Sequence, residues 1–120
     1  MSRIIQAVNA MISNADKISQ VIYGYNDELF FMYAGKYKWS IIKGSKDIFY
    51  LHYYPGKQDL EDLAAIKSWE GFREIVSYNS QDLGTKEAHD SLSELYNLIQ
   101  EKLFKIDKVI DDIIKDDFMF

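Results

Sequence analysis

The sequence predicts an α+β fold: an N-terminal helix, a four-stranded antiparallel meander, and a helical C-terminal half with one long helix packed on the sheet. Three turn-forming pairs, Asn26-Asp27, Gly35-Lys36 and Gly44-Ser45, recur every nine residues between apolar, aromatic-rich runs, which indicates a meander. The apolar residues on either side of these runs recur with a helical period. Strands followed by helices in this way are typical of the α+β class.

The composition is that of one globular domain spanning residues 1–120. Hydrophobic residues make up 48% of the chain and charged residues 28%, which is ordinary for a folded domain. The absence of cysteine excludes disulfides, thiolate metal sites and thiol nucleophiles. Polar residues interrupt the N-terminal apolar positions, so we expect no signal peptide, no membrane span and a cytoplasmic location.

Charge is distributed unevenly along the chain. Residues 1–57 carry seven Lys and Arg against four acids, whereas residues 58–120 carry seven against fifteen. Solvated or internally balanced charge is the simpler interpretation, and a basic partner for the acidic half is the alternative. Nucleic acid is not expected as a partner because the protein as a whole is acidic, with a pI near 4.9.

Residues 1–19 are predicted to form an amphipathic helix. Ser2 is a suitable N-cap. Successive apolar positions are four, three, four and three residues apart, so they share one face of a helix: Ile4, Val8, Met11, Ala15 and Ile18.

Residues 21–54 are predicted to form the meander, with strands at about 21–25, 28–34, 37–43 and 46–54 joined by two-residue loops. Such loops fix which residues lie opposite one another. Residue 30 is then expected to face residue 41, and residue 39 to face residue 50. Glu28 is expected to lie opposite Lys43 as a pair of unlike charges.

Alternation along these strands predicts two apolar faces rather than one apolar and one polar face. One is mostly aliphatic, with small residues at Gly24 and Ser40 where a helix could approach. The other is rich in aromatic residues with polar ends, and it contains our candidate ligand-binding set: Tyr23, Tyr37, Trp39, Tyr50 and His52. The simplest expectation is that helices cover this face; an open face would suit a small molecule.

The C-terminal half is predicted to be helical. Pro55-Gly56 ends the last strand, and residues 58–78 are expected to form short helices, with Phe72–Tyr78 as an edge strand the alternative. Residues 79–85 are expected to form a loop, and Thr85 to cap a long helix over 85–115, about 45 Å in length. Its apolar arc of roughly 160° and its overhang beyond the sheet predict a second packing partner.

The end of the chain supplies the candidate partner-binding residues. Three are acidic residues near the end of the long helix: Asp107, Asp111 and Asp112. The simpler interpretation is that this end of the helix is frayed and its acids are solvated. The others form the apolar end of the tail 116–120, which either folds back or inserts into another molecule: Phe118, Met119 and Phe120.

No constellation of residues predicts catalysis. There is no glycine-rich phosphate loop, no nucleophile elbow and no metal-ligand spacing around His52 or His89, so we expect no metal and no cofactor. The leading hypothesis is a non-enzymatic protein-interaction module that self-associates as a homodimer. The alternatives are an acidic, immunity-type inhibitor of a basic partner and a small-molecule-binding domain that uses the aromatic face.

Overall fold

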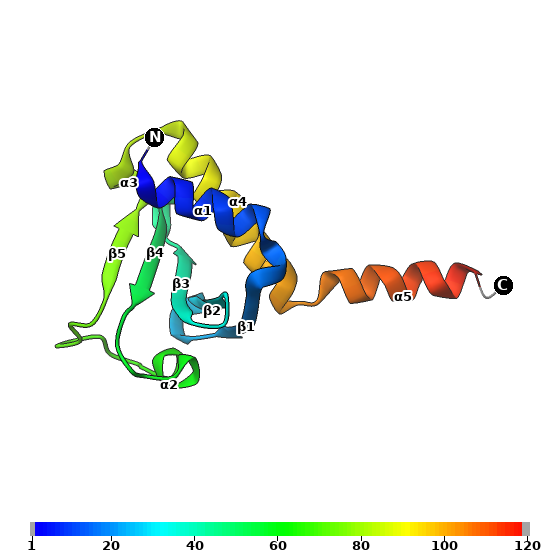
Figure 1. The fold of residues 1–120 in the computed structure, drawn as a ribbon, viewed down its shortest axis with the longest axis horizontal. Coiled ribbons are helices and arrows are strands. Elements are labelled where there is room, and N and C mark those ends of the chain that lie inside the picture. Colours follow the sequence, from blue (N-terminus) through cyan, green and yellow to red (C-terminus); the bar gives the residue numbers. More distant parts are fainter. Residues whose placement is uncertain (1, 119–120) are drawn as a thin grey trace.

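A five-stranded antiparallel meander, in the order β1-β2-β3-β4-β5, lies between helices in a computed structural model that describes residues 2–118 (Figure 1). The predicted α+β class is confirmed, with one strand more than expected. The strands are β1 Ile18–Tyr23, β2 Leu29–Tyr33, β3 Tyr37–Lys43, β4 Phe49–Tyr54 and β5 Val76–Asn79. The helices are α1 Arg3–Ser13, α2 Leu60–Ala64, α3 Ser80–Leu83, α4 Lys86–Leu103 and α5 Ile106–Phe118.

The capping residues predicted for the two main helices are confirmed. The Ser2 hydroxyl accepts a hydrogen bond from the backbone N–H of Ile5, and the Thr85 hydroxyl accepts one from that of Ala88. The first helix is shorter than predicted and ends at Ser13 rather than near residue 19. Asn14 leaves the helical conformation, with φ −116° and ψ 49°, and the chain enters β1 at Ile18, opposite Tyr33.

The fifth strand replaces part of the predicted pair of short helices. Only α2 forms between residues 58 and 78, and β5 pairs with β4 so that Val76 lies opposite Tyr53. The alternative of an edge strand near residues 72–78 was therefore the better prediction, shifted toward Asn79. Gly71 has a φ of +78°, a left-handed conformation that interrupts a helix in this segment. α3, at Ser80–Leu83, forms where a loop was expected.

The predicted two-residue hairpin loops are wrong, and the register changes with them. Asn26 and Asp27 do have positive φ, as a tight turn requires, but they lie inside a wider loop closed by the Gly24 N–H donating to the Glu28 carbonyl at 2.7 Å. The loop from Gly44 to Ile48 closes in the same way at 2.8 Å.

In the observed register Phe30 lies opposite Ser40, and Trp39 lies opposite Phe31 and Tyr53. The predicted partner of Trp39 was residue 50. Lys43 lies opposite Phe49 rather than Glu28, and it instead forms a salt bridge with Asp47 at 3.2 Å.

Apolar residues lie on both faces of the sheet, as predicted, and helices pack on each. The predicted division into an aliphatic and an aromatic face is wrong, because Phe31 shares a face with Trp39. On one face a core cluster joins α1 and α4 to the sheet (Figure 1); its strand members are Ile18, Leu29, Phe31, Ile41, Phe49 and Leu51. On the other face Phe30 and Tyr54 pack against Leu60 and Leu63 of α2. A Cβ at Gly24 would overlap the Phe30 ring and lie 3.3 Å from the Ala64 carbonyl, so the predicted close approach of a helix at Gly24 is observed.

The predicted long helix is two helices. α4 ends at Leu103, and Lys105 has a φ of 53°, a left-handed conformation that ends an α-helix and redirects the chain. α4 packs on the sheet, whereas α5 extends away from it (Figure 1), and the molecule measures 57 × 33 × 27 Å along its principal axes. Among the described residues, no helix combines the length and the apolar character needed to cross a bilayer.

Candidate functional site

The structure does not bring the five candidate ligand-binding residues together. Residues directly opposite in adjacent strands share a face of the sheet, so Trp39 lies with Phe31 and Tyr53 on the side of α1 and α4. Tyr23 lies opposite Leu29 on that same side, as does Tyr37. Tyr50 and His52 lie on the side that faces α2, because His52 is opposite Ser40.

Two of the five, Tyr37 and Trp39, line an apolar hollow with a volume of about 400 Å³. We call it the Trp39 groove; its lining residues are Ala7, Ala10, Met11, Tyr33, Tyr37, Trp39, Tyr53, Val76 and Tyr78. None of these residues is charged. α1 forms one wall with its small side chains, and the other residues come from β2, β3, β4 and β5. The groove therefore lies at the edge of α1, where this face of the sheet is no longer covered by a helix.

Trp39 itself has an incompletely satisfied side chain. Its ring packs against that of Tyr53, with centroids 4.9 Å apart, and its buried Nε1 has no hydrogen-bond acceptor within the described part of the chain. A buried N–H without an acceptor is uncommon in native structures.

On the opposite face, Glu28 is part of a buried polar cluster. The Ser40 hydroxyl donates to Glu28 Oε2 at 2.5 Å, and the Tyr54 hydroxyl donates to the same oxygen at 3.2 Å. The two hydroxyl oxygens are 2.7 Å apart. Burial raises the pKa of Tyr54 far above its usual value. Glu28, Ser40 and Tyr54 are all buried, so this cluster links β3 and β4, inside the protein, to the residue that precedes β2.

His52 lies beside this cluster and is partly exposed. Its Nδ1 is 2.8 Å from the hydroxyl oxygen of Ser77 on β5. Burial lowers the pKa of His52, and the charge of Glu28 partly offsets that shift. Within residues 2–118 as the structure describes them, no three His, Asp or Glu side chains converge as metal ligands.

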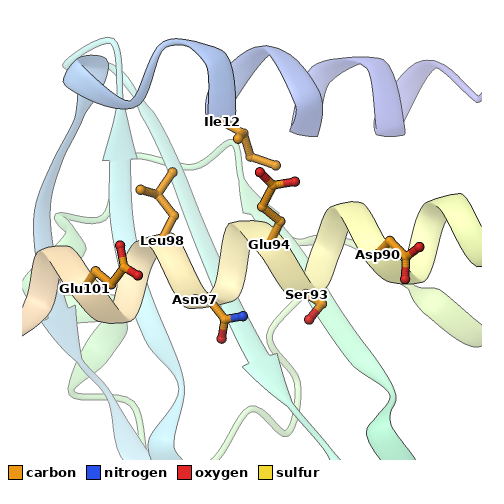
Figure 2. A pocket seen from close by; sticks show the side chains of 7 residues that line it. All are labelled: Ile12, Asp90, Ser93, Glu94, Asn97, Leu98 and Glu101. Atoms are coloured by element: carbon orange, nitrogen blue, oxygen red, sulfur yellow. The ribbon is translucent and has the colours of Figure 1, made fainter.

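A second hollow, of about 430 Å³, lies between α1 and α4 (Figure 2). We call it the α4 trough; its lining residues are Ile12, Asp90, Ser93, Glu94, Asn97, Leu98 and Glu101. Glu94 and Leu98 reach from α4 toward Ile12 of α1 (Figure 2). Asp90 is 3.8 Å from Lys86 Nζ, whereas among the described residues Glu94 and Glu101 form no salt bridge. These acids are not among the residues predicted from the sequence, although their helical spacing is visible in the chain.

The candidate partner-binding acids Asp107, Asp111 and Asp112 lie on α5. Every residue from 107 to 117 is exposed. α5 ends at Phe118, whereas Met119 and Phe120 lie outside the described residues. The prediction that the tail folds back or inserts into another molecule therefore concerns residues that lie largely outside the described part of the chain.

The most unusual feature of α5 is an exposed aliphatic stripe. Val109 and Ile110 are each 46% exposed, Ile113 is 64% exposed and Ile114 is 50% exposed. With the partly buried Ile106 they occupy an arc of roughly 140° at 100° per residue. We call this arc the α5 stripe.

Comparison with models of protein families, with curated proteins and with solved structures found no match to this chain. The geometry of its own surfaces is therefore the basis for a functional proposal.

Replacing Tyr54 with Phe tests the structural role of the buried cluster. The substitution removes a hydroxyl that donates to buried Glu28, so we expect the free energy of unfolding to fall by about 1–3 kcal/mol. Urea denaturation measures the change. The matched control is Tyr53→Phe on the same strand, where we expect a change within about 0.5 kcal/mol. Equal changes in the two variants would contradict this assignment.

Proposed function

We propose that the protein is a non-enzymatic interaction module that self-associates through α5. The observation that carries the proposal is the α5 stripe: four large aliphatic side chains, each about half exposed or more, on one face of a helix that extends away from the body. Contiguous exposed apolar surface of this kind is typical of an interaction site.

The length of α5 supports the same proposal. It has 13 residues, and an isolated helix of that length is only marginally stable in water. Packing of an amphipathic face supplies most helical stability in proteins. A partner that covered the stripe would therefore stabilise the helix as well as bury its apolar side chains.

The expected affinity is modest. Removing the exposed half of one such aliphatic side chain from water contributes roughly 1 kcal/mol. In a symmetric dimer both copies contribute, which gives roughly 8 kcal/mol in all. That alone would match a micromolar Kd, and the costs of association weaken it toward a millimolar Kd.

The other parts of the proposal rest on composition and on the buried cluster. A non-enzymatic role is supported by the burial of Glu28, Ser40 and Tyr54, which keeps these hydrogen-bonded polar side chains away from solvent. A cytoplasmic location is supported by the absence of cysteine.

Replacing two residues at the centre of the stripe, Ile110→Gln with Ile113→Gln, tests self-association. Glutamine keeps helix propensity close to that of other good helix formers and removes the apolar surface. We expect the wild-type chain to dimerise in sedimentation velocity between about 1 µM and about 1 mM, and the variant to have a Kd at least ~10-fold higher.

The matched control for this experiment is Lys108→Gln with Lys115→Gln, on the polar side of the same helix. We expect its Kd to remain within about 3-fold of the wild type. A wild-type chain that is monomeric throughout the concentration range would overturn the proposal, and so would a stripe variant that dimerises as well as the control.

A second candidate function is the acidic inhibitor of a basic partner, and the α4 trough favours it. The trough combines three carboxylates with the apolar side chains of Ile12 and Leu98, a surface suited to a Lys- or Arg-rich segment. Affinity for such a partner should fall as salt screens the charges.

A fluorescein-labelled lysine-rich peptide tests this candidate. We expect Glu94→Gln with Glu101→Gln to weaken its binding severalfold in fluorescence anisotropy at low salt, with a smaller effect at high salt. The control is Glu61→Gln with Asp62→Asn, which removes two exposed acids from α2. Equal loss in both double variants would show binding to overall charge and would count against the trough.

A further inference from the structure

We propose that α5 of one copy docks in the Trp39 groove of a second copy, and that the second copy's α5 docks reciprocally in the groove of the first. This inference rests on self-association through α5 and specifies the surface that receives the helix. A reciprocal arrangement has the two-fold symmetry that is commonest among homodimers.

The apolar character of the two surfaces matches. The α5 stripe exposes four aliphatic side chains, and the Trp39 groove is lined without any charged side chain. Ala7 and Ala10 lie one turn apart on α1, so this wall presents small side chains along which a helix backbone can approach closely. The exposed Val76 of β5 and Tyr37 of β3 supply apolar surface on the sheet side.

Repulsion between like charges disfavours the pairing of two α5 helices with each other. At 100° per residue, aspartates border the stripe on both sides, and Asp117 lies within its arc in the last turn; the bordering residues are Asp107 and Asp111 on one side, Asp112 and Asp116 on the other. Lys108 and Lys115 lie near the middle of the polar side. Two such stripes face to face would place acids beside acids along both borders, which is unfavourable.

The surroundings of the Trp39 groove are more suitable, because they carry cations. Arg3 lies one turn before Ala7 on α1. At the turn between β2 and β3, Lys36 Nζ is 4.8 Å from the centroid of the Tyr37 ring. The carbonyl of Lys17 accepts a hydrogen bond from Ala34 at 2.9 Å, which places Lys17, with its neighbour Asp16, at the same end.

The α4 trough is excluded as the receiving surface on the same grounds. Its lining includes Asp90, Glu94 and Glu101, and these acids would oppose the aspartates that border the α5 stripe. Of the Trp39 groove and the α4 trough, only the Trp39 groove combines an apolar lining with nearby cations.

The direction of α5 indicates that the groove belongs to another copy. In Figure 1, α5 leaves the molecule on the side away from β4 and β5, and both of these strands contribute to the groove. In this arrangement the helix does not reach the groove of its own chain. A second copy offers the same surface without any change at Lys105.

The experiment uses a groove variant and its complementation by a stripe variant. Ala10→Glu places a carboxylate on an exposed position of the groove wall, where it opposes the aspartates of the incoming helix. Asn9→Glu is the control, since it adds the same charge on another side of α1. Val76→Asp is a second groove variant from a different element, and circular dichroism checks that each variant is folded.

We expect Ala10→Glu and Val76→Asp to raise the dimer Kd at least ~10-fold in sedimentation velocity, while Asn9→Glu stays within about 3-fold of the wild type. An equimolar mixture of Ala10→Glu with the stripe variant Ile110→Gln/Ile113→Gln should associate more strongly than either variant alone, because one of the two reciprocal contacts joins an intact helix to an intact groove. Neither variant alone should dimerise at the same total concentration.

The outcomes separate this inference from the proposed function. If the stripe variant is monomeric but both groove variants dimerise like the wild type, α5 binds elsewhere, so the groove proposal fails and self-association through α5 stands. If the mixture associates no more strongly than the separate variants do, reciprocal docking is overturned. If the stripe variant dimerises like the wild type, the proposed function itself fails.

Discussion

The structure depends on the need to cover a sheet that is apolar on both faces. Large apolar side chains lie on both sides of the meander, so α1 and α4 pack on one face and α2 with its following loop packs on the other. Gly24 shows how close this packing is, because the Phe30 ring and the Ala64 carbonyl occupy the space that a larger side chain would need. Most of the remaining architecture follows from the packing of helices on each of the two faces of the sheet.

The cover is incomplete in one place, and another apolar surface lacks a partner. The Trp39 groove lies where α1 presents alanines to the sheet and the strands continue past the helices. The α5 stripe lies beyond Lys105, whose left-handed backbone ends the helical line of α4. Each surface needs apolar cover, and the charges around them are of opposite sign. A single association satisfies both, which is why we favour a second copy of this chain over an unrelated partner.

Local signals in the sequence were sufficient for the fold class but not for the register. The caps at Ser2 and Thr85 depend on neighbouring residues only, and both were predicted correctly. Asn26-Asp27 correctly predicted a turn, since both residues have positive φ. The loop is wider than two residues because the Gly24 N–H donates to the Glu28 carbonyl, and this closure depends on how the two whole strands pair. The corresponding change at the Gly44–Ile48 loop places Trp39 opposite Tyr53, on the face of the sheet away from Tyr50 and His52.

The candidate surfaces differ in how far they could be predicted from the sequence. The acids of the α4 trough follow a helical spacing that periodicity alone could have detected. The aliphatic residues of α5 were recognised as an overhang in need of a partner, but nothing in Phe104-Lys105 signals a break, since neither Gly, Pro nor Asn is present. The Trp39 groove joins α1 to strands that are distant in the chain, so its existence required the observed register and the position of α1.

Amide hydrogen exchange of α5 at two protein concentrations tests the central claim, that association covers this helix. In dilute solution the amides of residues 107–117 should exchange at nearly unprotected rates, because the isolated helix is marginal. At concentrations where dimers form, exchange in this segment should slow at least ~10-fold, while the core of the sheet should show no such change. Exchange rates in α5 that are the same at both concentrations would contradict the account.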